Sequence, residues 1–217
     1  MKNMTSANVS KKKLGKRNES ESNESKNKIL DAALHLFATK GYNSTSLRDI
    51  ANLADVSHSL IRHHFGSKES LWKACIQHGF DKMADIVAPL TEKVTPENAL
   101  ESMKTIIRLL VTSAAKQPDL WSILSFEALK NSERLDHVIE VITPINEMVY
   151  PVFQLAQDSG HFKSLNETDV FVFVASAGAV PYSMQPLYEK LTGEEVLVAK
   201  NAEMHANFLI EILLKGD

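Results

Sequence analysis

The sequence predicts an all-α protein with a short N-terminal three-helix unit followed by a larger helical body. Apolar residues recur at i, i+3, i+4 and i+7 along much of the chain, which is the period of a helix buried on one face. Only residues 170–174, VFVFV, have the β-branched and aromatic composition of a strand, and no partner strand is visible for them. With 44% hydrophobic residues in 217, the chain can bury a substantial core.

Residues 1–25 are expected to form a disordered basic tail. They are rich in Ser, Asn, Lys and Glu and nearly free of apolar residues, so they cannot offset the entropy cost of ordering. The tail either stays solvated or reaches a phosphate backbone through its basic residues. Those residues are Lys11, Lys12, Lys13, Lys16 and Arg17.

Three helices are expected in residues 26–68. The first covers residues 26–40, and two short ones lie within residues 45–68, TSLRDIANLADVSHSLIRHHFGSK. Thr45 or Ser46 is suited to cap the first short helix, and Ser57 is suited to cap the second. Ile61 then lies on the buried side of the second short helix, because its apolar neighbours recur at helical spacing.

The outward side of that second short helix carries the side chains expected to contact nucleic acid. A helix that packs through one face and presents Arg, Ser and His on the other has what reading a DNA major groove requires. We expect base contacts from Ser59, Arg62, His63, His58 and Leu60. We expect phosphate contacts from Thr45, Ser46, His64 and Lys68.

Residues 28–71 resemble the DNA-binding domain of the TetR family of transcriptional regulators. The matching elements are LFA at 36–38 with GY at 41–42, TSLRDIA at 45–51, VS at 56–57 and FGSKE at 65–69, at gapless spacing. The chain departs from the commonest family pattern at Arg62 and His64, where tyrosines usually lie, and at Gly66, often a proline. The resemblance implies a DNA-binding domain at residues 26–72 and a ligand-binding and dimerisation domain at residues 73–217.

Charge is unevenly distributed in a way that fits this division. Residues 1–25 hold 6 basic and 3 acidic side chains, residues 26–75 hold 7 and 4, and residues 76–217 hold 11 and 20. The partial net charges of +3, +3 and −9 add to the total of −3. A basic N-terminal third on an acidic body is typical of a protein that binds a polyanion at one end only.

The body is expected to consist of further helices. Pro89, Pro118 and Gly160 mark ends of helices, and a TGEE capping box at 192–195 is expected to begin the last one. We favour helix over strand for residues 170–174, because the small residues that follow continue at helical composition. The expected helices cover about 67–87, 96–118, 119–130, 132–158, 170–180 and 192–214.

The TetR resemblance implies that the last two helices form a four-helix seam between two copies of the chain. A two-fold dimer would present two recognition helices about 34 Å apart to a near-palindromic operator. An internal core without a dimer is the alternative. The residues expected at the seam are Phe171, Val174, Gly178, Met204, His205, Phe208, Leu209 and Ile212.

The resemblance also implies a pocket in the middle helices for a small-molecule effector of unknown identity, whose binding moves the two DNA-binding heads out of register. Aromatic and Met side chains at helical spacing would equally suit a plain core. The pocket candidates are Met103, Ile107, Trp121, Phe126, Tyr150, Phe153, Tyr182 and Met184.

Catalytic, metal-binding and membrane-spanning functions are not predicted. The chain has no Gly-rich phosphate loop, CxxC, HExxH or GxSxG motif, so no catalytic residue, metal or cofactor is expected. The longest mostly apolar run, residues 170–180, is shorter than the roughly 20 residues that span a bilayer. The single Cys75 is expected to pack in a core rather than to sense redox state, in a reducing cytoplasm.

The sequence therefore predicts a cytoplasmic, homodimeric repressor that a small molecule releases from double-stranded operator DNA. The alternative is a DNA-binding regulator, repressor or activator, that responds to a protein partner or to no ligand.

Overall fold

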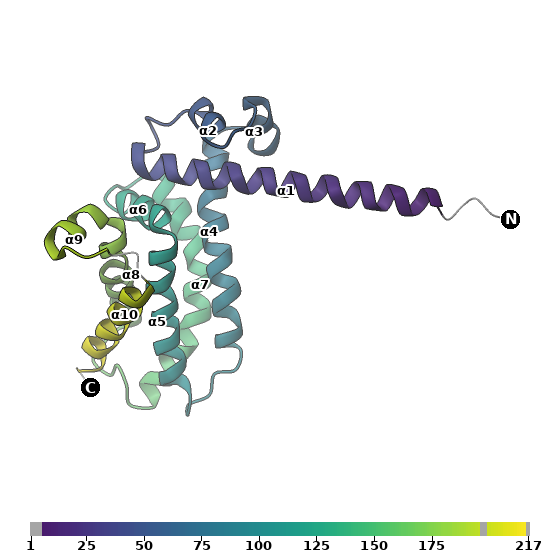
Figure 1. Cartoon of the computed structure of the whole chain (residues 1–217). Coiled ribbons are helices and arrows are strands. Elements are labelled where there is room, and N and C mark those ends of the chain that lie inside the picture. Colours follow the sequence, from purple (N-terminus) through teal and green to yellow (C-terminus); the bar gives the residue numbers. More distant parts are fainter. Residues whose placement is uncertain (1–5, 196–198, 216–217) are drawn as a thin grey trace. The chain divides into compact units, whose positions relative to one another are not determined.

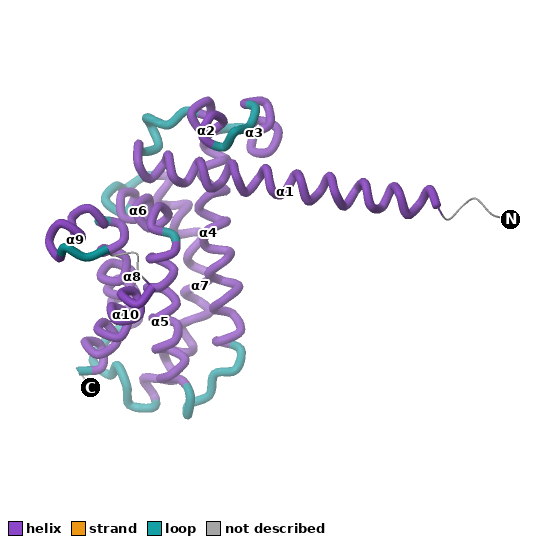
Figure 2. Tube along the Cα trace, viewed as in Figure 1, coloured by secondary structure: helices purple, strands orange, loops and turns teal. Residues whose placement is uncertain are grey.

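The computed structural model describes residues 6–195 and 199–215, without the side chains of residues 6–21, 199 and 200. Across those residues the chain contains ten helices and no strand, which confirms the all-α prediction (Figure 1, Figure 2). The chain divides into two compact units, Met1–Cys75 and Ile76–Asp217. This division lies close to the predicted domain boundary after Trp72.

The N-terminal unit contains three helices and the beginning of a fourth. They are α1 (Ser6–Lys40), α2 (Leu47–Leu53), α3 (His58–Phe65) and the first turns of α4 (Lys68–Thr91). The unit is held together by a small core to which every one of these helices contributes a fully buried apolar side chain. The largest of them are Ile29, Ile50, Ile61, Leu71 and Trp72. Burial of such side chains is the main force that keeps a unit of this size folded.

The start of α1 differs from the sequence prediction. A disordered tail to residue 25 and a helix from about Lys26 were expected, but α1 begins at Ser6. The segment contains no proline, and extending an existing helix avoids the cost of nucleating a new one. An ion pair from Lys28 to Glu24 at i, i+4 lies where the polar segment joins the packed one. The side chains from Lys11 to Arg17 lie outside the described residues.

The C-terminal unit is a helical bundle around α5. Its helices, after the rest of α4, are α5 (Ala99–Lys116), α6 (Pro118–Glu127), α7 (Glu133–Asp158), α8 (Glu167–Ser183), α9 (Gln185–Thr192) and α10 (Ala199–Leu214). Helix α5 contacts α6, α7, α8 and α10. At Gly178 an added Cβ would lie 3.0 Å from Val111 Cγ2, so the missing side chain lets α8 approach α5 closely.

Helix boundaries in this unit were predicted unevenly. Residues 170–174 are helical, as favoured, and α7 begins after Ser132, whose hydroxyl accepts from the Leu135 N–H at 3.3 Å. Helix α4 continues past Pro89 to Thr91, so the predicted stop before the proline is wrong. The predicted capping box is also wrong, because Thr192 ends α9 and Gly193 follows it with φ +73°.

No single helix in the described ranges is long and apolar enough to cross a membrane. Helices α8 and α9 pass the same test only as a pair, bent by 74°.

Candidate nucleic-acid interface and ligand cavity

The turn between α2 and α3 is built by local backbone chemistry. Asp55 takes a left-handed conformation with φ 52°, which Asp tolerates better than most residues. The Val56 N–H then reaches back to the Ala51 carbonyl at 3.0 Å. These features end α2 and place Ser57 as the N-cap of α3, where its hydroxyl accepts from the Leu60 N–H at 3.2 Å. The result is a helix-turn-helix.

Ser46 begins α2 through a capping box. Its hydroxyl accepts from the Asp49 N–H at 3.2 Å, and the Asp49 carboxylate accepts from the Ser46 hydroxyl and the Ser46 N–H at 2.7 and 3.0 Å. These hydrogen bonds hold the pKa of the Asp49 carboxyl below its usual value. Ser46 stays exposed, so its predicted phosphate contact is compatible with its role as a cap.

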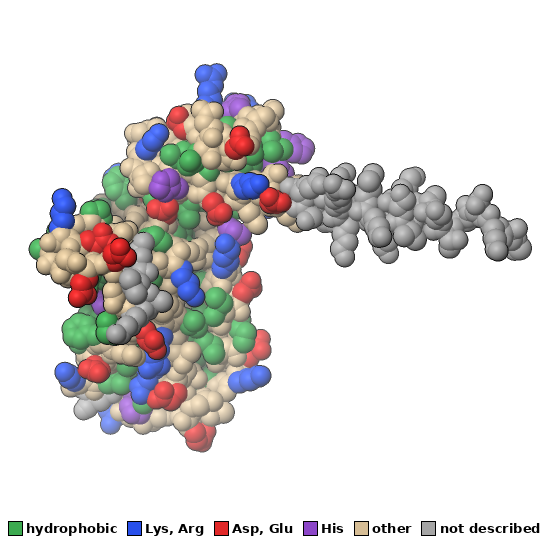
Figure 3. Space-filling view, viewed as in Figure 1, with side chains coloured by type: hydrophobic (Ala, Val, Ile, Leu, Met, Phe, Trp, Pro, Cys, Tyr) green, Lys and Arg blue, Asp and Glu red, His purple; other side chains and the backbone are tan. Residues whose placement is uncertain are grey.

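Helix α3 presents an exposed polar side, as the sequence predicts. Ser59, Arg62 and His63 are exposed, while His58, Leu60 and His64 are half-buried. Histidine side chains gather over this part of the N-terminal unit (Figure 3). The His63 and His64 rings lie edge to face with centroids 5.5 Å apart. The opposite side of α3 is anchored by Ile61, which is fully buried.

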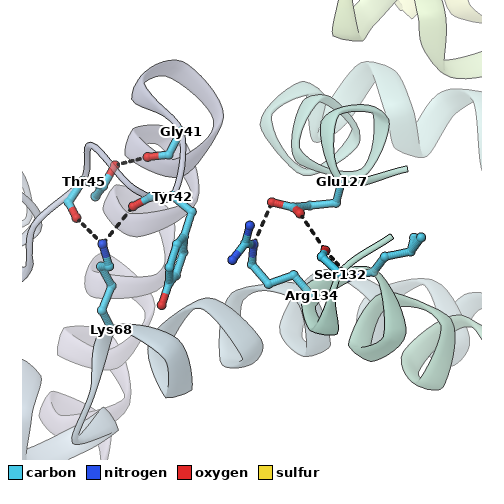
Figure 4. A network of polar contacts seen from close by, with 8 residues as sticks. Gly41, Tyr42, Thr45, Lys68, Glu127, Ser132 and Arg134 are labelled. Carbon is cyan, nitrogen blue, oxygen red and sulfur yellow. Dashed lines mark hydrogen bonds and ion pairs between the residues drawn. The ribbon is translucent and has the colours of Figure 1, made fainter. Parts of the chain in front are cut away.

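Two of the predicted phosphate contacts, the buried Thr45 and the half-buried Lys68, have polar groups that are hydrogen-bonded within the N-terminal unit. Thr45 is only 2% exposed, and its hydroxyl donates to the Leu36 and Gly41 carbonyls at 3.1 and 2.9 Å. Lys68 Nζ donates to the carbonyls of Tyr42 and Thr45 at 2.9 and 3.0 Å and lies 4.4 Å from the centre of the Tyr42 ring (Figure 4). Thr45 and Lys68 therefore fix the loop between α1 and α2.

Gly66, where the family often has a proline, has φ +75° and donates its N–H to the Arg62 carbonyl at 3.0 Å. Proline can supply neither that φ nor that donor. The departure from the family pattern thus follows from the way α3 ends in this chain.

The C-terminal unit contains a cavity of about 340 Å³ between α4, α5, α6, α7 and α8, which opens to the surface beside the exposed lining residues Ile139 and Val172. Its wall is mostly apolar, with Phe80, Ile107, Ile142 and Phe171 among the lining side chains. A concave apolar site with a few polar groups is the usual form of a small-molecule pocket.

The structure brings together half of the predicted pocket residues. Met103, Ile107, Trp121 and Phe153 line the cavity. Phe126, Tyr150, Tyr182 and Met184 do not, so their placement in the pocket is corrected. Phe126 and Met184 are exposed, Tyr150 accepts a hydrogen bond from Gln154 on the same exposed side of α7, and Tyr182 is buried edge to face with His205.

The polar groups of the wall were missed at the sequence level. They are Ser125, Asn146, Glu167 and Ser176, together with the indole of Trp121. Trp121 Nε1 is buried and has no hydrogen-bond partner among the described residues. Burial raises the pKa of the Glu167 carboxyl. Asn146 could have been found from the sequence, because the lining residues of α7 recur every three or four positions and Asn146 falls within that series. The isolated Ser125, Ser176 and Glu167 belong to no such series.

An ion pair between the buried Glu127 and the half-buried Arg134 links α6 to α7 and was also missed. Glu127 is 2% exposed, and its carboxylate accepts from Arg134 Nε at 2.9 Å and from the Ser132 hydroxyl at 3.5 Å (Figure 4). Removing one member of such a pair leaves a buried charge without compensation. The pair thus determines how α6 meets α7, next to the lining residues Ala128 and Leu135.

The predicted seam residues divide into buried and exposed sets. Val174, Gly178 and Leu209 are buried within the chain, where Gly178 faces Val111 and Leu209, so they are not available to a partner. Phe171 lines the cavity, and His205 Nε2 lies 2.8 Å from the Ala177 carbonyl oxygen. The remaining three, Met204, Phe208 and Ile212, form an exposed apolar row at i, i+4 and i+8 on α10.

Two family models match the chain. One, described as bacterial regulatory proteins of the tetR family, covers residues 29–75, and the other, a tetracyclin repressor-like C-terminal domain, covers residues 100–213.

Curated relatives match only part of the chain. The biofilm operon icaADBC HTH-type negative transcriptional regulator IcaR of Staphylococcus aureus is 37% identical over 62 residues, which is 29% of this chain and 33% of IcaR. The chain thus spans a third of that relative. The HTH-type transcriptional repressor KstR2 of Rhodococcus jostii is 29% identical over 145 residues, covering 63% of this chain and 67% of KstR2.

Solved structures share the fold over most of the chain. FadR from Bacillus subtilis, in complex with stearoyl-CoA, has a TM-score of 0.68 at 16% identity. AibR, in complex with isovaleryl coenzyme A and operator DNA, has a TM-score of 0.68 at 19% identity. Each comparison covers 88% of this chain and 98% of the other. At these identities the likeness shows a common fold.

Proposed function

Because the chain belongs to the TetR family of bacterial regulatory proteins, we propose that it is a homodimeric repressor that an apolar small-molecule effector releases from a near-palindromic operator. The matched family and both curated relatives are transcriptional regulators, not enzymes. The observation that carries the proposal is the exposed row of Ser59, Arg62 and His63 on a capped and internally anchored α3.

Operator recognition rests on that row. Arg62 is the side chain best suited to read sequence, because a guanidinium can donate two hydrogen bonds to the O6 and N7 atoms of guanine. Ser59 is held near the helix start, with its hydroxyl 2.9 Å from the Ser57 hydroxyl. His63 lies beside Arg62 on the same exposed side. Ser46 and His64 are the proposed phosphate contacts of the unit.

The effector is proposed to bury an apolar chain in the cavity of the C-terminal unit. The wall of that cavity is overwhelmingly apolar, and two proteins of the same fold are described in complex with acyl thioesters, stearoyl-CoA and isovaleryl coenzyme A. Filling a preformed apolar cavity removes apolar surface from water and supplies the binding free energy.

The dimer is proposed to form through the exposed apolar residues of the last helices. Phe208 is 57% exposed and lies between Met204 and Ile212 on α10, and Val172 and Val180 are exposed on α8. Exposed apolar side chains gathered on the last helices favour an interface. A two-fold axis through it would give two recognition helices and hence a two-part operator, bound in the cytoplasm where the DNA lies.

Selection of the purified protein against random DNA tests the DNA-binding proposal. We expect an enriched near-palindrome whose half-sites are about one helical turn apart. Arg62→Ala should lose preference at one base position in each half-site, with about 1–3 kcal/mol of discrimination removed. Unchanged preference at every position would remove Arg62 from base reading, and no enrichment at all would contradict operator binding.

Thermal unfolding with candidate effectors tests the ligand proposal. A bound effector should raise the melting temperature in a concentration-dependent way and should weaken binding to the selected operator in parallel. If ligands across a broad lipophilic library shift neither quantity, control by a protein partner or by no ligand is the better account.

A further inference from the structure

The wall of the cavity has an unusual charge composition. Of all its lining side chains, Glu167 alone is ionisable, and no Lys, Arg or His is among them. The other polar side chains, Ser125, Asn146 and Ser176, are neutral and can donate a hydrogen bond to a carbonyl or hydroxyl oxygen. The wall therefore offers partners to neutral polar groups and none of the cationic side chains that pair with an anion.

The lining residues also show that the cavity is elongated. Along α7 they recur every three or four residues, from Leu135 through Val138, Ile142 and Val149 to Phe153. At 1.5 Å per residue this stripe is roughly 27 Å long. Glu167 lies in the first turn of α8, which follows α7 after a short loop, so Glu167 is near the Phe153 end. The cavity suits a long, narrow ligand with Glu167 toward one end.

Glu167 is not neutralised by any side chain that the structure describes. Among the described residues it has no hydrogen bond or ion pair, and burial is the cause of the raised pKa of its carboxyl. The favourable N-terminal end of α8 is also already occupied by acceptors of this chain. The Asn166 side chain accepts from the Asp169 N–H at 2.8 Å, and Asp169 itself lies in the same turn. A ligand anion here would therefore meet one negative charge and no cationic side chain among the lining residues.

We propose that Glu167 makes the cavity selective for an elongated lipophilic ligand whose buried part is uncharged, such as a fatty ester, an acyl thioester or a fatty alcohol, and that it excludes the free fatty acid. The inference rests on the proposed binding of an apolar effector in the same cavity. Two carboxylates at one site repel, and desolvating a second one without a cation is costly. An ester or alcohol oxygen carries no such cost and can accept from the neutral wall groups.

Displacement of an environment-sensitive apolar dye from the full chain tests the proposal. The competitors are palmitic acid, methyl palmitate and hexadecanol, each below its aggregation concentration, at neutral pH and fixed salt. Palmitoyl-CoA is a fourth competitor, because its charges are far from the acyl chain and can stay in solvent. The expected result is that the ester and the alcohol bind at least about tenfold more tightly than the acid, a free-energy difference of about 1.4 kcal/mol.

Glu167→Gln keeps the shape of the side chain and removes its charge, so the acid should gain affinity until it binds within about threefold of the ester. Asp169→Asn is the matched control, since Asp169 is exposed in the same turn and does not line this cavity. For Asp169→Asn, the ratio of the affinity for the acid to the affinity for the ester should equal that of the unmodified chain. Because each ratio is taken within one variant, a modest loss of stability in either does not affect it.

Each result decides between the two proposals. If the acid binds the unmodified chain as tightly as the ester, or if Glu167→Gln leaves the ratio unchanged, the role of Glu167 is wrong while the cavity remains a ligand site. If no competitor displaces the dye and none raises the melting temperature, the apolar effector itself is wrong, and the proposal about Glu167 fails with it. If palmitoyl-CoA binds more tightly than methyl palmitate and hexadecanol while the acid remains the weakest, the proposal is supported and a thioester is identified as the source of the neutral buried chain.

Discussion

Lys68 shows how a residue can belong to a DNA-binding motif and still be used inside the fold. Its ammonium group donates to two carbonyls of the loop between α1 and α2 and lies over the Tyr42 ring. With three donors on the ammonium group, two are already committed to the chain. Its effect on DNA binding is then expected to be indirect, through the placement of α2 and α3.

Lys68→Met should lower the free energy of unfolding by about 1.5–3 kcal/mol, because two hydrogen bonds from a charged donor are lost. It should weaken operator binding without changing the slope of log K against log salt. A lost phosphate contact would instead reduce that slope by about one. Fluorescence anisotropy at several salt concentrations measures the slope.

Lys73→Met is the matched control, since it removes one positive charge from an exposed pair with Glu69 on the same helix. Its stability should change by less than about 1 kcal/mol. A reduced slope for Lys68→Met would return Lys68 to the phosphate contacts.

Cys75 is a second residue whose environment predicts its chemistry. It is buried, with Sγ 3.6 Å from the Leu30 carbonyl oxygen, and burial raises the pKa of its thiol far above neutral. Since the thiolate is the reactive form and a raised pKa keeps the thiol protonated, the native protein should not react with an alkylating or aromatic disulfide reagent. Full reaction is expected once denaturant unfolds the chain. Rapid labelling of the native protein would contradict the packed position and favour a redox-sensing thiol.

At the scale of helices, the capping box of α2 accounts for where that helix begins. The three hydrogen bonds between Ser46 and Asp49 satisfy donors that a seven-residue helix has few other means to satisfy. Ser46→Ala should therefore lower the free energy of unfolding by about 1 kcal/mol, with a range of about 0.5–2. Chemical denaturation measures it. Asn52→Ala, on the exposed side of the same helix, should change it by less than about 0.5 kcal/mol.

The contribution of the same cap to the free energy of unfolding depends on pH, and the lowered pKa of Asp49 determines the sign of that dependence. A carboxyl with a folded pKa below its unfolded value stabilises the native state above the unfolded pKa. That contribution is lost as the pH falls through the folded value. The difference in stability between the unmodified chain and Asp49→Asn should therefore shrink on acidification. A difference that grows toward low pH would contradict the assignment.

The boundaries of the longer helices show which local signals were reliable. Ser46, Ser57 and Ser132 act as N-caps, each through a hydroxyl that accepts from the N–H three residues later. Ser57 was predicted in this role, and Ser46 was one of two candidates, with Thr45. Pro89 was misleading, because α4 passes it and ends only at Thr91. Prolines also lie within α7 at Pro144 and Pro151. Packing of the apolar stripes outweighs one lost backbone hydrogen bond in such helices.

At the scale of the whole molecule, the proposed dimer can be tested on the exposed row of α10. Phe208→Glu should convert the protein to a monomer in analytical ultracentrifugation, because it places a charge in the middle of an apolar interface. It should also weaken operator binding, since a monomer contacts one half-site only. The monomer should keep its helical content, because Phe208 is exposed and outside the core.

Leu129→Glu is the matched control for that experiment. Leu129 is 82% exposed and follows α6, outside the row on α10, so the same charge change there should leave the molecular mass unaltered. A monomeric Leu129→Glu variant, or a dimeric Phe208→Glu variant, would place the interface elsewhere.

The sequence by itself determined the all-α fold, the helix-turn-helix and its exposed face on α3. These features depend on interactions between residues three or four positions apart, namely helical periodicity, N-caps and a turn at Asp55, all of which are visible along one segment. The family resemblance of residues 28–71 has the same local origin.

Only the tertiary structure decided which side chains line the cavity, which bury in the core and which face solvent. Met103 and Tyr182 both suited a pocket by type, yet only Met103 lines one. Gly178 and Phe208 both suited a seam, yet Gly178 is covered by α5 and Phe208 is exposed. Lys68 is held by carbonyls of the loop between α1 and α2, and Glu167 lies on the cavity wall because of how α8 packs. An apolar or charged residue does not itself specify what it packs against, because that depends on elements distant in the chain.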